Sequence, residues 1–112
     1  MSKFDYDLFV IGGGSGGVRA GRVAASMGKK VAIAEADRVG GTCVLKGCVP
    51  KKIMSYASHY ADSLSEAKGY GFDIQHTFDF KTFAQKRNDE IDRLNGIYLT
   101  MLEGSNVDLI EG

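Results

Sequence analysis

The sequence predicts an α/β fold, in which crossover helices connect the strands of a parallel sheet. Residues 8–11 and 31–34 are short, continuous apolar runs, which is the pattern of strands buried on both faces. Between them, a glycine-rich turn leads into a segment whose apolar residues recur at helical spacing. Strand, turn, helix and strand in this order form a βαβ unit, and we expect its crossover to be right-handed.

The first strand is followed by a helix, a second strand, a loop and another helix. Gly28 is a suitable stop for the first helix, whose apolar positions are Val18, Ala20, Val23, Ala24 and Met27. After the second strand, residues 37–50 are expected to form a loop that carries both cysteines. Beyond Pro50, one apolar face at helical spacing predicts an amphipathic helix, and this face consists of Ile53, Tyr56, Ala57, Tyr60, Ala61 and Leu64.

A glycine-containing break at residues 69–71 separates that helix from another one. Asp79 is the expected N-cap and Gly104 the expected end of this last helix. Its apolar stripe comprises Phe80, Phe83, Arg87, Ile91, Leu94, Tyr98, Met101 and Leu102. Residues 107–110 are typical of a third strand. Three strands leave one or both sheet edges open, so we expect residues 1–112 to be a fragment of a longer protein.

Composition and charge restrict the class of protein. With 112 residues, the chain is one domain or a piece of one. Its 44% hydrophobic content is too high for disorder, and it has no apolar run long enough for a membrane span. Fourteen basic residues balance fourteen acidic ones, which gives no indication of nucleic acid or an anionic membrane as a partner. The N-terminus does not read as a secretory signal, so we expect a cytoplasmic protein, in which a disulfide is more often catalytic than structural.

The glycine-rich turn fits the dinucleotide-binding pattern G-x-G-x-x-G of a Rossmann-like sheet. Gly12 allows the tight turn, Gly14 lets a pyrophosphate approach the backbone, and Gly17 allows close packing of helix on sheet. The helix N-terminus supplies N–H groups to the phosphates. Glu35 ends the second strand, eighteen residues past Gly17, where it can accept hydrogen bonds from an adenosine ribose. The motif alone does not distinguish FAD from NAD(P).

The segment around the two cysteines is the most specific feature of the chain. Residues 40–52 read G-G-T-C-V-L-K-G-C-V-P-K-K. This run resembles the redox-active disulfide segment of the pyridine-nucleotide disulfide oxidoreductases, and the resemblance extends from Tyr6 to Gly112. It implies that the chain is the N-terminal portion of an FAD-binding domain, with the NADPH and dimerisation domains absent from residues 1–112.

The resemblance also implies roles for individual residues of the segment. Cys43 would be the interchange thiol that attacks the substrate disulfide, and Cys48 the thiol beside the flavin. Cys48 is expected just before a helix N-terminus, where the helix dipole stabilises a thiolate. Lys51 would lie near the reactive flavin nitrogen, with Lys52 as the alternative. The residues expected to contact FAD are Gly12, Gly14, Ser15, Gly16, Gly17, Glu35, Gly41, Thr42, Cys48 and Lys51.

The two cysteines have two other interpretations. A structural disulfide gains more stability from closing a longer loop than the one between Cys43 and Cys48. A structural zinc site needs four ligands, and the remaining candidates, His59 and His76, lie at no recognised ligand spacing. Both histidines are more simply interpreted as solvated residues, so a redox disulfide is favoured.

The expected substrate is glutathione disulfide. Lys51 occupies a position where dihydrolipoamide dehydrogenases and mercuric reductases of the family usually carry Ser. Arg19 and Arg22 share the helix face that begins at Ser15, and arginines suit the carboxylates of glutathione disulfide. The resemblance to the family implies that Ser15, Arg22 and Tyr98 contact the substrate. For Tyr98, a place in the apolar core is the competing interpretation.

The implied reaction is the reduction of glutathione disulfide by NADPH through FAD and the Cys43–Cys48 disulfide, as part of thiol redox homeostasis in a homodimer. Neither histidine matches the family's catalytic acid, which the partner subunit provides, and Glu90 stands where some members carry a second substrate tyrosine. Two alternatives stay open. One is a flavoenzyme acting on dihydrolipoamide or mercuric ion, and the other is an FAD-binding fragment without catalysis.

Overall fold

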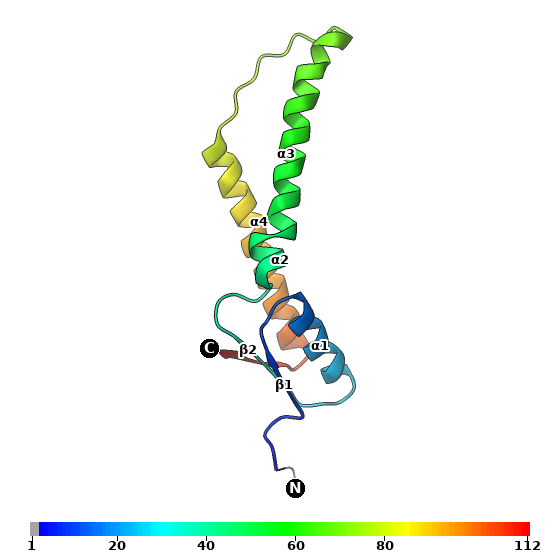
Figure 1. Ribbon diagram of the computed structural model, residues 1–112, viewed down its shortest axis with the longest axis vertical. Helices are drawn as coiled ribbons and strands as arrows, with labels where there is room; N and C mark the ends of the chain where they lie inside the picture. The colour runs from blue at the N-terminus through cyan, green and yellow to red at the C-terminus, as the bar shows by residue number, and fades with distance from the viewer. Residues whose placement is uncertain (1–2) are drawn as a thin grey trace.

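The computed structural model describes residues 3–112 and shows a small parallel sheet from which a long helical hairpin projects (Figure 1). The secondary structure elements along the chain are β1 (Leu8–Ile11), α1 (Ser15–Ser26), β2 (Val31–Glu35), α2 (Gly41–Lys46), α3 (Cys48–Glu66), the 3-10 helix η1 (Ala67–Tyr70), α4 (Phe80–Gly104) and β3 (Asp108–Glu111). The predicted α/β fold with a Rossmann-like parallel sheet is confirmed.

The sheet has the order β1-β2-β3, and both strand pairs are parallel. Leu8 is in register with Val31, and Ala32 with Asp108. The expectation that the first strand is buried on both faces was wrong for this chain. β1 lies at an edge, and Ile11 is 91% exposed. Only β2, between two neighbours, has the continuous burial that its apolar run predicts: Val31, Ala32 and Ile33 are fully buried.

The core lies where α1 and the last turns of α4 pack on β2. Its buried members are Val18, Val31, Ile33, Val39, Leu102 and Val107. Gly21 lets α1 approach the sheet, since a Cβ at this position would lie 2.8 Å from Cδ1 of Ile33. The contact explains why the first helix is rich in small residues on the side that faces the strands.

The expected loop at residues 37–50 was wrong in its second half. The structure forms α2 there and starts α3 at Cys48. α2 forms because Val44 can be buried to 4% exposure, which gives the short helix an apolar anchor. Gly40, with a φ of 123°, and Gly47 mark the two ends of α2. Periodicity did not reveal this helix because six residues are too few to show it.

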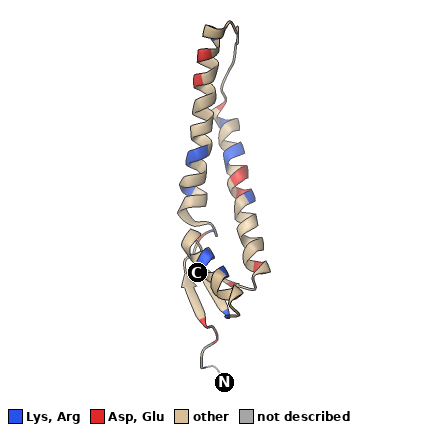
Figure 2. Cartoon of the chain, turned by 90° about the vertical axis from the view of Figure 1, so that its right-hand side faces the viewer, with Lys and Arg blue, Asp and Glu red and all other residues tan. Residues whose placement is uncertain are grey.

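The hairpin of α3 and α4 carries charged residues of both signs along its length (Figure 2). Asp79 caps α4 as predicted and accepts a hydrogen bond from the N–H of Lys81 at 3.2 Å. The expected apolar stripe is buried only toward the sheet, at Ile91 and Leu102, whereas Phe80 is 60% exposed. Within residues 3–112, no helix combines the length and the apolar character that crossing a bilayer requires.

Candidate active site

The glycine turn after β1 requires glycine at its first and last positions. Gly12 has a φ of 104°, a conformation that favours glycine, and its N–H donates to the carbonyl of Ala34 at 2.8 Å. A Cβ on Gly17 would lie 1.9 Å from the carbonyl oxygen of Gly12. Any larger residue at position 17 would therefore push α1 away from the turn.

The N-terminus of α1 is open and positively polarised. Among the described residues, no side chain caps this helix and no acidic residue occupies its first turn. A Cβ on Gly16 would meet no atom within 4 Å, and one on Gly14 would meet only Gly41, at 3.7 Å. Bare backbone with free N–H groups at a helix start is the arrangement that binds a diphosphate. The turn therefore fits the phosphates of a dinucleotide.

The carboxylate of Glu35 is held against this turn. One oxygen accepts a hydrogen bond from the N–H of Gly13 at 3.3 Å, and the other accepts from the N–H of Asp37 at 3.4 Å. An ionised carboxylate has about four acceptor positions, so both oxygens keep room for further donors. The arrangement fits the hydroxyls of a ribose that follows the diphosphate.

The redox segment consists of α2 and the start of α3. Cys43, on α2, forms a disulfide with Cys48, the first residue of α3, and their Cα atoms lie 4.6 Å apart. We expected Cys48 just before this helix, whereas it is the first residue of the helix. Pro50 is in the first turn of α3, as predicted, and is buried. Cys48 is exposed and Cys43 half-buried, so the two sulfurs have unlike surroundings.

The phosphate turn and the redox segment are in direct backbone contact. The N–H of Gly40 donates to the carbonyl of Gly13 at 2.9 Å. A Cβ on Gly41 would lie 2.6 Å from Cα of Gly14, and Gly41 also has a φ of 65°. Both motifs thus lie together, with Cys43 two residues beyond the contact.

The two lysines after the disulfide differ in their surroundings. Both are exposed on the first turns of α3. The ammonium group of Lys52 lies 5.8 Å from the ring centroid of Tyr56, within the range of a cation–π interaction. The N–H of Lys51 donates to the carbonyl of Gly47 at 2.9 Å, which is part of the helix start.

The predicted substrate contacts come together in one groove. Ser15, Arg22 and Tyr98 all line a hollow of about 410 Å³ between α1 and α4. The other residues that line it are Val18, Arg19, Val23, Ser26 and Met101. Tyr98 also packs against the core, as its competing interpretation expects, and its contact with a substrate stays a prediction. The groove begins at Ser15, next to the glycine that contacts the redox segment.

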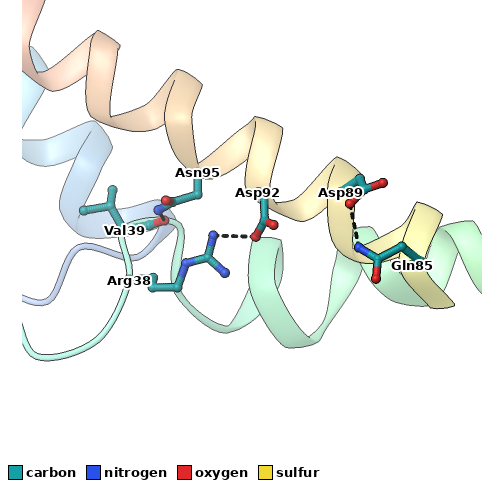
Figure 3. A network of polar contacts seen from close by, with 6 residues as sticks. All are labelled: Arg38, Val39, Gln85, Asp89, Asp92 and Asn95. Atoms are coloured by element: carbon teal, nitrogen blue, oxygen red, sulfur yellow. Dashed lines mark hydrogen bonds and ion pairs between the residues drawn. The ribbon is translucent and has the colours of Figure 1, made fainter.

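Some residues near the site were missed by the sequence reasoning. The Nε of Arg22 donates to the hydroxyl of Ser105 at 3.4 Å, which orients the arginine from the end of α4. Asn95 and Asp92, both on α4, hold the residues that precede the redox segment (Figure 3). A signal for Asn95 was present, since it follows the buried Ile91 by one helical turn and is thus a polar residue on the apolar stripe.

Glu90, His59 and His76 do not line the groove between α1 and α4. Glu90 forms an ion pair with Arg93 at 2.7 Å, and hydrogen bonding to this guanidinium lowers the pKa of the Glu90 carboxyl. His59 and His76 are exposed on α3 and in the connection before α4, as expected. The Glu90 carboxylate is therefore paired within α4.

The fold and the site together define a dinucleotide-binding protein with a redox disulfide beside its phosphate turn. Residues 6–112 match the family described as pyridine nucleotide-disulphide oxidoreductase. The chain belongs to this family. Membership implies that the whole protein uses FAD and a nicotinamide nucleotide.

Several curated relatives carry one name. The chain is 50% identical to a glutathione reductase of Burkholderia cepacia over 100% of its own length and 25% of the relative's. It is 50% identical to a glutathione reductase of Nostoc sp., over 97% of the chain and 24% of that protein. It is 42% identical to a chloroplastic/mitochondrial glutathione reductase of Pisum sativum, over 98% and 22%. The chain thus spans about a quarter of the length of these relatives.

Proposed function

We propose that this chain supplies the FAD-binding and redox-disulfide portion of an enzyme that reduces glutathione disulfide with NADPH. The observation that carries the proposal is the groove of Ser15, Arg22 and Tyr98, which begins beside the glycine turn that contacts the redox segment. Names of the relatives agree with this substrate. The nicotinamide-binding and dimerisation regions, and the partner subunit's catalytic acid, would lie outside residues 1–112.

The glycine turn and Glu35 would hold FAD. The uncapped N-terminus of α1 would bind the diphosphate, and the Glu35 carboxylate would accept from the ribose. Gly41, Thr42, Cys48 and Lys51 would then lie along the flavin. Bound FAD would pass to the disulfide the electrons it receives as hydride from NADPH. Because Lys52 is engaged with Tyr56, the structure favours Lys51 as the flavin-side lysine.

The exchange chemistry follows from the position of each cysteine. In the reduced state, Cys48 at the start of α3 is stabilised as a thiolate by the helix dipole. The Cys43 thiolate attacks one sulfur of glutathione disulfide, and the substrate S–S bond breaks. One glutathione leaves with a proton from an acid outside this chain. The Cys48 thiolate then attacks the Cys43 sulfur of the mixed disulfide, which releases the second glutathione and restores Cys43–Cys48.

The charge of the groove favours an anionic substrate. Arg19 and Arg22 both line it, and the part of the chain described provides no acidic residue in its lining. Guanidinium groups bind carboxylates with two parallel hydrogen bonds, and glutathione disulfide carries several carboxylates. A neutral dihydrolipoamide-type substrate would make no use of these groups.

Steady-state kinetics of the full-length protein would test the proposal. We expect Arg22→Gln to raise the KM for glutathione disulfide by about tenfold or more, because a charged hydrogen bond contributes about 1.5–3 kcal/mol. Arg87→Gln is a matched control, since Arg87 lies on α4 and contacts Asn88 rather than the groove. Faster reduction of lipoamide than of glutathione disulfide would contradict the proposal. A bound flavin that NADPH does not reduce would favour a non-catalytic module.

A further inference from the structure

The segment that leads into the redox disulfide is held from two sides. On one side, the N–H of Gly40 bonds to the glycine turn. On the other side, Nδ2 of Asn95 donates a 2.8 Å hydrogen bond to the carbonyl of Val39. Arg38, directly before it, forms a 2.8 Å ion pair with Asp92, one turn earlier on α4 (Figure 3). Helix α4 thus contacts two consecutive residues just before α2.

The two contacts from α4 differ in how strongly they are expected to stabilise the segment. The Asn95 bond is partly buried, and Val39 itself is only 3% exposed, so losing the amide would leave a carbonyl with poor access to water. The Arg38–Asp92 pair is open to solvent, with side chains 43% and 63% exposed, and such pairs are weak. Asn95 is therefore the principal contact.

The backbone conformation of Gly40 and Gly41 explains why the Asn95–Val39 hydrogen bond affects α2. Gly40 and Gly41 both have positive φ values, 123° and 65°, and Gly41 begins α2. Glycines restrict their own backbone very little, so the direction of α2 depends on the packing of Gly41 and Val44 and on what fixes the residues before them. Cys43 is in the first turn of α2, and its sulfur must meet that of Cys48 on a different helix.

We infer that Asn95 is a positioning residue for the redox disulfide. By fixing the Val39 carbonyl, it orients Gly40–Gly41 and thereby the start of α2, which keeps Cys43 in bonding position to Cys48. Asn95 also precedes Tyr98 by one turn, so α4 carries both the disulfide support and a wall of the groove. The consequence for catalysis rests on the proposed function, but the consequence for the disulfide equilibrium does not.

The direct test is the equilibrium between the Cys43–Cys48 disulfide and its dithiol in defined thiol buffers, measured on the full-length protein. Asn95→Leu keeps the approximate size and removes the donor. Asn95→Asp keeps the shape and places a carboxylate against the Val39 carbonyl. We expect both to lower the equilibrium constant for closing the disulfide by about tenfold, which is about 30 mV for a two-electron couple.

Matched variants separate positioning from general destabilisation. Asn88→Asp and Asn88→Leu alter an exposed asparagine on the same helix. Asp89→Asn removes a negative charge from α4 but keeps an acceptor for the bond from Gln85, and Asp92→Asn removes the ion pair to Arg38. Val31→Ala weakens the core that β2 shares with Val39 and leaves both contacts from α4 in place. We expect Asp92→Asn to shift the equilibrium less than the Asn95 variants, and the other controls to leave it unchanged.

Kinetics give a second readout. In the Asn95 variants, we expect kcat to fall by about 10- to 100-fold, the cost of misplacing a reacting group, while the KM for glutathione disulfide stays within about twofold. A disulfide equilibrium equal to that of the unmodified protein would overturn the inference. So would an equal shift in Val31→Ala, because the effect would then reflect stability alone. An unmodified protein that fails to reduce glutathione disulfide would overturn the proposed function, and the equilibrium would still test Asn95.

Discussion

At the scale of single residues, two neighbouring glycines of α1 have opposite requirements. A Cβ at position 17 would overlap the carbonyl of Gly12, whereas one at position 16 would meet nothing. We expect Gly17→Ala to lower the free energy of unfolding by about 1–3 kcal/mol. Gly16→Ala should raise it by about 0.5–1 kcal/mol, because alanine restricts the unfolded chain and suits a helix.

Urea unfolding of the flavin-free protein would measure both changes. Gly16→Ala is the control for adding a methyl group to the first turn of α1. Equal stability of the two variants would show that α1 can shift away from the turn at no cost.

At the residue scale, the sequence could indicate candidate positions where the chemistry has a fixed spacing, and their ligand contacts stay predictions. The glycine turn, Glu35 and the cysteine pair could be located because each needs one residue type at one place. Asn95 could be noticed as a polar residue on the apolar stripe, but its partner could not be assigned, because that partner is a backbone carbonyl 56 residues away. The same holds for Ser105, which contacts Arg22 only after α4 has packed on α1.

At the scale of elements, the ends of α4 were predicted from capping chemistry, and the apolar runs located the strands to within one residue. The α2 helix was missed because its stability comes from Val44 in the core and from the disulfide, not from its own sequence. The edge position of β1 was also missed. A run of apolar residues shows that a strand can be buried on both faces. The run itself does not show which neighbouring elements will cover those faces.

The cap of α4 makes the start of this helix sensitive to acid. The Thr82 hydroxyl and the Lys81 N–H both donate to Asp79, and the bond from Thr82 is the main cause of the lowered pKa of the Asp79 carboxyl. A lowered folded-state pKa stabilises the folded form above the unfolded pKa, and this stabilisation is lost as the pH falls through the folded value. We expect amide protection in the first turn of α4 to decrease over that acidic range.

Hydrogen exchange at several pH values would measure this effect. Asp79→Asn is the control, because an asparagine still accepts the capping hydrogen bonds and does not titrate. Protection that decreases equally in both proteins would contradict a role for Asp79 ionisation.

At the scale of the whole molecule, the chain is extended. Its axes measure 75 × 24 × 18 Å, since α3 and α4 run away from the sheet (Figure 1). The far half of the hairpin holds an apolar groove of about 490 Å³, lined in part by Met54, Leu64, Phe78 and Phe83. In residues 3–112 this groove is uncovered, whereas the sheet end has a closed core.

Small-angle scattering of the isolated chain would test this shape. We expect a radius of gyration near the 20.3 Å of the Cα trace. A compact domain of about this length would give about 13 Å. A value near the compact one would mean that the hairpin folds back onto the sheet when nothing else contacts it.

The contacts of the redox segment also set an order of events on the ribosome. Gly40 can dock on the glycine turn as soon as both have emerged, but Asn95 is added 56 residues after Val39. At a synthesis rate of about 5–20 residues per second, that interval is about 3–11 s. For most of this time the two cysteines are in the nascent chain while helix α4 is still incomplete. On the inference drawn for Asn95, the cysteine pair is therefore synthesised well before the contact that positions it.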